Sequence, residues 1–137
     1  MGYMMNTGAH GLLAGTISWS ADTIKVRPVL SADTPDEDAT VMTGIGVTGN
    51  DQTLGTKVGP TKDDTNDRTT YGAANPTFAS QPAGGAVNKL MIFKFVTNDA
   101  DSIPIAVVDI DAITPNGGDI AITFTGGLCF ALNNQPA

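Results

Sequence analysis

Hydrophobic and polar residues alternate over several short stretches of the chain, the pattern of β-strands that bury one face. The first such stretch follows Asp22 and divides its side chains between two faces of the predicted strand: Ile24, Val26, Pro28 and Leu30 on one, Lys25, Arg27 and Val29 on the other. Proline has no amide hydrogen to donate to a neighbouring strand. We therefore expect this strand to lie at a sheet edge or to change partner at Pro28.

The strongest hydrophobic segment is AVNKLMIFKFVT, residues 86–97, which leaves neither face fully polar and predicts the central strand. An acidic turn and a second strand over residues 103–111 complete a predicted hairpin. Two further strands, over residues 120–125 and 128–132, are expected around a tight turn at Gly126 and Gly127. The C-terminal third is thus predicted to be a four-stranded meander whose core-facing side chains are Ala106, Val108, Ile110, Ile120, Ile122, Phe124, Leu128, Phe130 and Leu132.

The N-terminal and middle segments carry weaker patterns. Residues 9–14, AHGLLA, predict one or two helical turns that pack Leu12 and Leu13, within an N-terminal arm over residues 1–15. Residues 40–49 suggest a second short strand. Residues 43–85 are rich in Gly, Thr, Asp and Asn, so we expect short strands joined by long surface loops there.

Composition supports an all-β fold of one domain. The 137 residues include 18 Thr, 16 Gly and 8 Pro, but only seven Leu and a single Glu, so the residues that favour strands and turns outnumber those that favour helices. With the arm set aside, residues 16–137 are predicted to form a single antiparallel β-sandwich or jelly-roll-like domain of seven to nine short strands.

The net charge of −7 and the pI near 4.2 disfavour two classes of partner. An acidic chain lacks the electrostatic attraction that drives binding to nucleic acids, and anionic membranes repel it as well. No uninterrupted apolar run approaches the ~20 residues of a membrane-spanning helix. Neither nucleic acid nor membrane is therefore expected as a partner.

The sequence offers no set of reactive residues in a known spacing. His10 and Cys129 are the only residues of their kinds, which excludes a zinc site of the usual type, and Cys129 is predicted to be a buried apolar residue. Acidic clusters at 36–38, 63–67 and 99–101 resemble solvated turns more than calcium loops. Asp109 and Asp111 share one side of a strand and are expected to face water. We expect no cofactor, no metal and no enzymatic activity.

Five residues are candidates for an interface with other chains. Trp19 suits either the core or an interface, whereas Tyr71 and Phe78 stand isolated in the polar middle and suggest inter-subunit anchors. Lys25 and Arg27, with Lys89 and Lys94, form either a small basic patch or an ordinary solvated strand face.

The stretch LLAGTISWSADTIKVRPVLSADTPDEDAT resembles the opening of a group of small structural proteins of tailed-bacteriophage virions. The elements MIFKF, IPIAVVDID, NGGDIAITF and GLCFAL follow the order seen at the end of that group, while residues 43–85 depart from its pattern. The resemblance covers residues 12–40 and 86–132. It implies a non-enzymatic capsid decoration or cement protein on the virion surface that binds the major capsid protein as a homo-oligomer, for which a trimer is the expectation. The alternatives are a phage tail or fibre component and a carbohydrate- or receptor-binding β-module.

Overall fold

The computed structural model describes residues 2–133, which form ten strands, one α-helix and one 3₁₀ turn. The elements in chain order are β1 (Tyr3–Met4), α1 (Asn6–Ala14), β2 (Ile24–Leu30), β3 (Gln52–Thr53), β4 (Val58–Asp63), β5 (Arg68–Gly72), β6 (Thr77–Phe78), β7 (Val87–Lys94), β8 (Ile103–Ile113), β9 (Ile120–Ala121), η1 (Thr125–Gly127) and β10 (Leu128–Asn133). Every strand pairing is antiparallel. The all-β prediction is confirmed, with more strands than expected because four of them are only two residues long.

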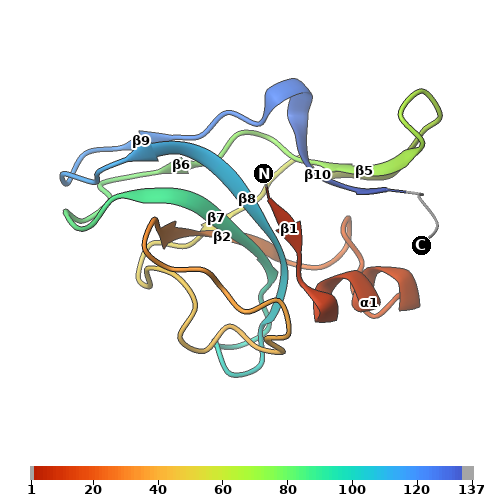
Figure 1. The fold of residues 1–137 in the computed structure, drawn as a ribbon, viewed down its shortest axis with the longest axis horizontal. Helices are drawn as coiled ribbons and strands as arrows, with labels where there is room; N and C mark the ends of the chain where they lie inside the picture. The colour runs from red at the N-terminus through yellow and green to blue at the C-terminus, as the bar shows by residue number, and fades with distance from the viewer. Residues whose placement is uncertain (1, 134–137) are drawn as a thin grey trace.

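The strands form three sheets arranged as a sandwich-like fold (Figure 1). A five-stranded sheet, in the order β1-β8-β7-β2-β3, lies in the middle of the molecule. The β10-β5-β4 and β6-β9 sheets cover one of its faces, at the top of Figure 1. The long segment between β2 and β3, residues 31–51, covers the opposite face, and we call it the covering loop.

Two hydrophobic cores follow from this arrangement, one on each face of the five-stranded sheet. The first lies toward the smaller sheets and contains Ile24, Tyr71 and Phe78, one from each sheet, together with Trp19 and Phe124 from the connecting segments. The second lies under the covering loop and consists of Met5, Val29, Met42, Ile45, Met91, Phe93 and Val107. The central sheet is therefore buried on both faces.

The predicted central strand, residues 86–97, corresponds to β7, which pairs with β2 on one side and β8 on the other. The prediction that the strand containing Pro28 lies at a sheet edge is wrong, because β2 lies between β7 and β3; its pairing with β3 covers only Lys25 and Val26, however, and so has ended before Pro28. The prediction that β2 buries one face is wrong. Val29 belongs to the second core and Arg27 is buried beneath the covering loop, a layer that strand periodicity does not reveal.

The predicted meander of the C-terminal third is wrong beyond its first hairpin. β7 and β8 pair as expected, but β9 pairs with β6 and β10 with β5, and η1 joins them in place of a two-residue hairpin. These strands cross to the second layer because their apolar side chains cover the open face of the five-stranded sheet. The predicted inward side chains of 120, 122 and 124 are buried, whereas a bulge after Leu128 leaves that residue exposed and buries Cys129.

The predicted N-terminal arm is part of the folded domain over its described residues. β1 pairs with β8, and α1 packs against the same strand. The helix begins earlier than predicted, at Asn6, and its buried residues are Gly8 and Gly11, so Leu13 is exposed instead of packed. A Cβ atom on Gly8 would lie 2.3 Å from Ile105 Cα, which shows how closely the two backbones approach. Met1 and residues 134–137 of the predicted ranges lie outside the described residues.

The polar middle supplies more of the core than its composition indicates. The short strands β3 to β6 and their loops confirm the expected organisation of residues 43–85, yet Leu54, Tyr71 and Phe78 are all buried in the first core. The strand suggested over residues 40–49 is absent from the described chain. Met42 and Ile45 instead enter the second core from turns at Gly44 and Gly46, where φ is positive.

The contact between α1 and β8 predicts a specific effect of adding one methyl group. Gly8→Ala should lower the free energy of unfolding by about 1–3 kcal/mol, because the new Cβ must displace backbone atoms of β8. Urea denaturation measures this. Gly84→Ala is the matched control, since nothing lies within 4 Å of its Cβ position. Equal stabilities for the two variants would contradict the close approach.

Candidate interaction surfaces

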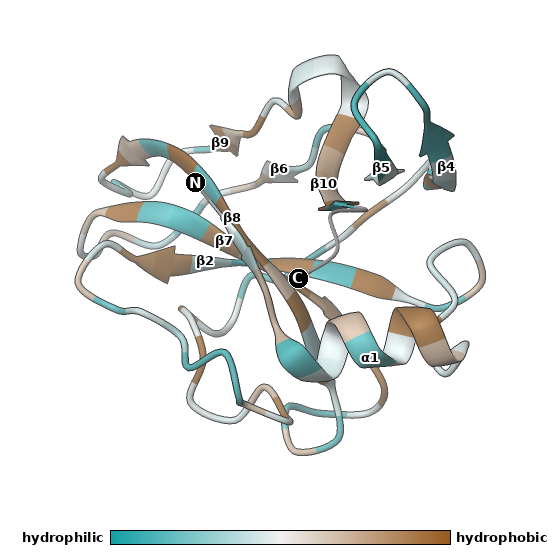
Figure 2. Cartoon of the chain, turned by 45° about the vertical axis from the view of Figure 1, so that its right-hand side comes forward, coloured by the Kyte–Doolittle hydropathy of each residue, from teal (hydrophilic) through white to brown (hydrophobic). Residues whose placement is uncertain are grey.

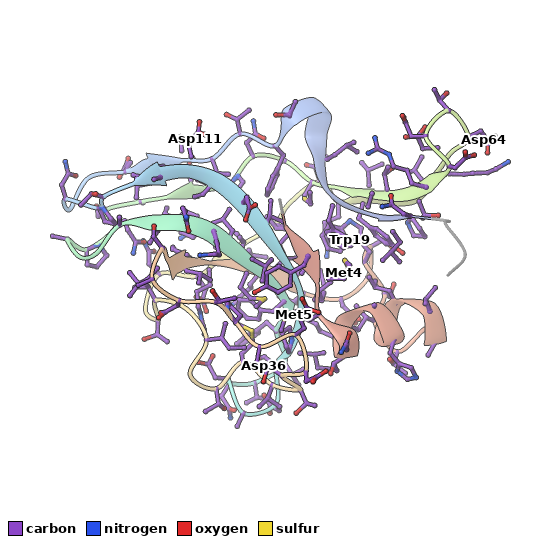
Figure 3. All side chains as sticks on the ribbon, in the orientation of Figure 1. Met4, Met5, Trp19, Asp36, Asp64 and Asp111 are labelled. Atoms are coloured by element: carbon purple, nitrogen blue, oxygen red, sulfur yellow. The ribbon has the colours of Figure 1, made fainter. Side chains whose placement is uncertain are left out.

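The aromatic residues singled out from the sequence form an internal cluster. Trp19, labelled in Figure 3, is 2% exposed, and its Nε1–H donates to the carbonyl oxygen of Gly72 at 3.0 Å. Its ring meets the rings of Tyr71 and Phe130 edge to face, with centroids 5.7 and 5.2 Å apart, and those two rings stack at 4.7 Å. The cluster joins the α1–β2 connection to β5 and β10.

Burial changes the roles expected for these rings. Phe78 is 1% exposed and cannot anchor another subunit, which corrects the sequence-based expectation. Tyr71 is 5% exposed, so its ring is also a core residue, although its hydroxyl makes no hydrogen bond with any described residue. Isolated aromatic residues in this polar segment attach it to the core, because the segment has few other large apolar side chains to bury.

Arg27 is the only buried charged residue of the described chain, with 2% of its surface exposed. Its Nε and Nη2 donate to the two carboxylate oxygens of Asp51 at 2.7 and 2.8 Å. Nη1 and Nη2 donate to the carboxylate oxygens of Asp99 at 3.1 and 2.8 Å, and Nη1 also donates to the carbonyl oxygen of Ile45 at 2.9 Å. These contacts use all five N–H groups of the guanidinium.

This arrangement, which we call the Arg27 cluster, attaches two loops to β2. Asp51 ends the covering loop, Ile45 lies within it, and Asp99 belongs to the β7–β8 turn. The hydrogen bonds with Asp51 outweigh the opposing effect of burial and hold the pKa of Arg27 above its ordinary value. Arg27 is therefore a structural residue and not part of a surface patch.

The three lysines predicted to accompany Arg27 are bound to separate groups. Lys25 Nζ lies 3.7 Å from the centroid of the Phe95 ring, and Lys94 forms an ion pair with Asp22 at 3.1 Å. Lys89 Nζ donates to the carbonyl oxygens of Ser31 and Asp33, at 3.3 and 2.9 Å. Of the two alternatives, a basic patch and an ordinary strand face, the patch is not formed by these side chains, because each lysine contacts a different group.

The acidic clusters are turns whose carboxylates bind the chain itself. Asp101 accepts hydrogen bonds from the backbone N–H groups of Asn98 and Thr97, which lower its pKa. Hydrogen bonds from Asn66 and Arg68 likewise lower the pKa of Asp63. Figure 3 places Asp36, Asp64 and Asp111 on three separate parts of the surface. Within residues 2–133, no group of three or more His, Cys, Asp or Glu side chains is placed to hold a metal ion.

Asp109 and Asp111 are exposed, as predicted for the outward side of β8. Cys129 is buried, also as predicted, and burial raises the pKa of its thiol to about 12. His10, the only histidine, is an exposed residue of α1. A thiol that stays protonated at neutral pH is a poor nucleophile.

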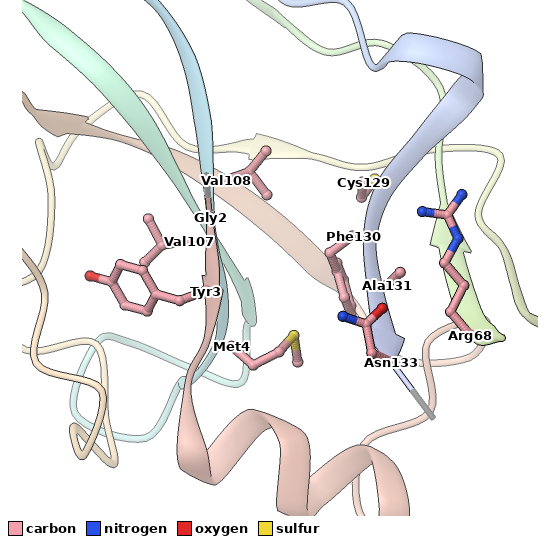
Figure 4. Close-up of a pocket in the computed structure, with 10 residues that line it drawn as sticks. All are labelled: Gly2, Tyr3, Met4, Arg68, Val107, Val108, Cys129, Phe130, Ala131 and Asn133. Carbon is pink, nitrogen blue, oxygen red and sulfur yellow. The ribbon is translucent and has the colours of Figure 1, made fainter. Parts of the chain in front are cut away.

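A groove of about 340 Å³ separates β1 and β8 from β10 (Figure 4). Met4 lies on one side of it, and Phe130 and Asn133, both from β10, lie on the other side in that view. Its lining is mostly apolar, with Arg68 and Asn133 as the longer polar side chains, and contains neither carboxylate nor histidine among the described residues. The groove is a gap between the edges of two sheets and lacks the acid–base groups of a hydrolytic site.

No protein-family model, curated protein or solved structure matches this chain. The resemblance to phage virion proteins therefore stays a prediction. In residues 2–133, the single helix α1 has nine residues, and no helix has the length and apolar character needed to cross a membrane.

The Arg27 cluster predicts a large loss of stability when its cation is removed. Arg27→Met should lower the free energy of unfolding by about 3–5 kcal/mol, because Asp51 and Asp99 would face each other across an apolar side chain. Chemical denaturation measures this. Lys62→Met removes an exposed cation paired with Asp64 and should have a much smaller effect. An Arg27→Met protein as stable as the wild type would refute the structural role of the cluster.

The setting of Cys129 predicts an unreactive thiol in the folded protein. At pH 8, a thiol with a pKa of about 12 forms on the order of a thousandfold less thiolate than an ordinary one, so alkylation should be slow until the chain unfolds. Because the folded pKa is raised, this residue's contribution to stability is complete below about pH 9 and declines toward pH 12. Iodoacetamide labelling followed by mass spectrometry, with and without urea, measures the difference. Rapid labelling of the native protein would contradict it.

Proposed function

We propose that this protein is a non-enzymatic structural component of a phage virion, a capsid decoration or cement subunit that binds the assembled shell as a homo-oligomer. The sequence resemblance over residues 12–40 and 86–132 supports this assignment. The observation on which it mainly rests is the Arg27 cluster. Arg27 is the one buried charged residue of the described chain, and all five N–H groups of its guanidinium donate to other residues of the chain. The guanidinium of Arg27 therefore has no N–H group left for a ligand, and we place the function on the surface of the domain.

A stable, two-sided core suits a subunit that adds to a finished shell. Both faces of the central sheet are covered, and no described side chain has a buried nitrogen or oxygen without a hydrogen-bond partner. Such a module changes shape little on binding and therefore loses little conformational entropy. A subunit that binds only the assembled shell stabilises it against disassembly by mass action.

The carbohydrate-binding alternative receives less support. Sites for sugars rely on exposed aromatic rings, and the eight aromatic residues, all within residues 2–133, are buried or only partly exposed. A tail or fibre position is consistent with the same fold. Binding to shells distinguishes these alternatives.

The proposed function predicts saturable binding to empty shells of the cognate major capsid protein. The purified chain should co-sediment with expanded shells and raise their melting temperature, because it binds the assembled state and not the dissociated subunits. An unrelated acidic protein of similar size and charge is the control for non-specific adsorption. Absence of co-sedimentation at all ratios would contradict the decoration role and favour a tail or receptor-binding position. A hydrolase activity lost in Asp109→Ala would contradict the non-enzymatic assignment.

A further inference from the structure

The turn between β8 and β9 contains the sequence PNGG, residues 115–118, and Asn116 is the only asparagine of the chain that a glycine follows. Asn116 and Gly117 are exposed, and φ of Gly117 is +93°, a conformation that glycine adopts without strain. The end of β8 and strand β9 are brown in Figure 2, because apolar residues flank the polar turn on each side. The turn therefore exposes a thermolabile amide next to a backbone nitrogen that carries little steric protection.

The side chain of Asn116 is held in an orientation that activates its amide carbon, Cγ. Its Oδ1 accepts a hydrogen bond from the backbone N–H of Gly118 at 3.0 Å, which is an Asx-turn. A donor on the amide oxygen stabilises the negative charge that develops there when a nucleophile attacks Cγ. The nucleophile next to it in the chain is the backbone nitrogen of Gly117. No heavy atom lies within 4 Å of the position of a Cβ on that residue, so the approach of its nitrogen is unobstructed.

Asn98, in the β7–β8 turn, provides a comparison within the same chain. It is also exposed, and its Oδ1 accepts a hydrogen bond from the backbone N–H of Ala100 at 2.8 Å, which forms the same kind of turn. The residue that follows is Asp99, whose carboxylate is held by Arg27. The backbone of Asp99 cannot rotate toward the Asn98 amide without disturbing that ion pair. The two asparagines thus differ in the nucleophile and not in the activation of the amide.

We propose that Asn116 is a site of spontaneous deamidation in the folded protein. The nitrogen of Gly117 loses its proton and forms a bond with Cγ of Asn116, the bond between Cγ and Nδ2 breaks, and the amide nitrogen leaves as ammonia with that proton. Water then opens the resulting cyclic imide at either of its two carbonyl groups. The net reaction exchanges ammonia for water and yields aspartate or isoaspartate. Water is the only co-reactant.

The reaction alters a contact between two loops. The N–H of Gly117 donates to the carbonyl oxygen of Gln81 at 2.9 Å, and the N–H of Gln81 donates to that of Gly118 at 3.0 Å. Figure 1 shows the two loops at the left end of the molecule. Attack requires the bond from Gly117 to open, so the rate follows local opening of the turn. Isoaspartate lengthens the backbone at position 116, which displaces Gly117 from Gln81, and either product adds a negative charge to the turn that contains Asp119.

Incubation of the full chain in mildly alkaline buffer, followed by peptide mapping with mass spectrometry, tests the proposal. The peptide with Asn116 should gain the mass of an amide-to-acid conversion and separate into aspartate and isoaspartate forms. The peptide with Asn98 should keep its amide over the same period. The rate should rise with pH, because the attacking nitrogen must lose a proton. Asn116→Ser is the matched control, since it keeps an oxygen for the turn but has no amide to lose, and its peptide should show no change of mass.

Anion exchange separates the deamidated form by its additional negative charge. Urea denaturation of this form should give a lower free energy of unfolding than that of the fresh protein, because the hydrogen bonds with Gln81 are disturbed. A folded protein that keeps the Asn116 amide, even if the urea-unfolded chain loses it, would overturn the proposal, as would equally fast loss at Asn98. A deamidated form as stable as the fresh protein would overturn the structural consequence. None of these results depends on whether the chain binds shells.

Discussion

The buried guanidinium of Arg27 is the interaction on which the two-sided architecture depends. Burying a cation away from water is costly unless its charge and all its donors are satisfied. Asp51 and Asp99 neutralise it, and the carbonyl of Ile45 takes the remaining N–H. Because these partners come from two different loops, the same contacts that make the buried charge tolerable also hold the covering loop on the central sheet.

Coverage of the second face explains features that otherwise look unrelated. Once the covering loop is fixed, Met42 and Ile45 have an apolar surface to enter, and Val29, Met91 and Phe93 can be hydrophobic on a side of the sheet that would otherwise face water. The Met42 amide completes the attachment by donating toward the carbonyl oxygens of Asp99 and Ser102, at 3.0 and 3.1 Å. A small β-domain thereby gains a second core from a loop without regular secondary structure, which enlarges its buried apolar area.

The sequence predicted what depends on local pattern and missed what depends on distant partners. The central strand, its hairpin and the exposed Asp109 and Asp111 follow from periodicity. The burial of Arg27 does not, because its carboxylate partners lie 24 and 72 residues away and a charged residue in an alternating strand ordinarily faces water. The pairing of β9 with β6 could not be predicted from the local pattern either, because the two strands are far apart in the sequence. The predicted helical turns over residues 9–14 leave out Gly8, because glycine disfavours helices, yet Gly8 is the residue at which the helix backbone approaches β8.

The distribution of charge over the surface determines where an acidic domain can contact other chains without strong electrostatic repulsion. Repulsion between exposed charges is screened beyond roughly 8 Å at physiological ionic strength, so the charges near a contact matter more than the net charge. The acidic turns that contain Asp36, Asp64 and Asp111 lie on separate parts of the molecule and repel other copies there. Three long stretches of the described chain carry no Asp, Glu, Lys or Arg: residues 7–21, 69–88 and 120–133. Another chain therefore meets the least electrostatic repulsion where these stretches reach the surface, and the acidic turns disfavour contacts elsewhere.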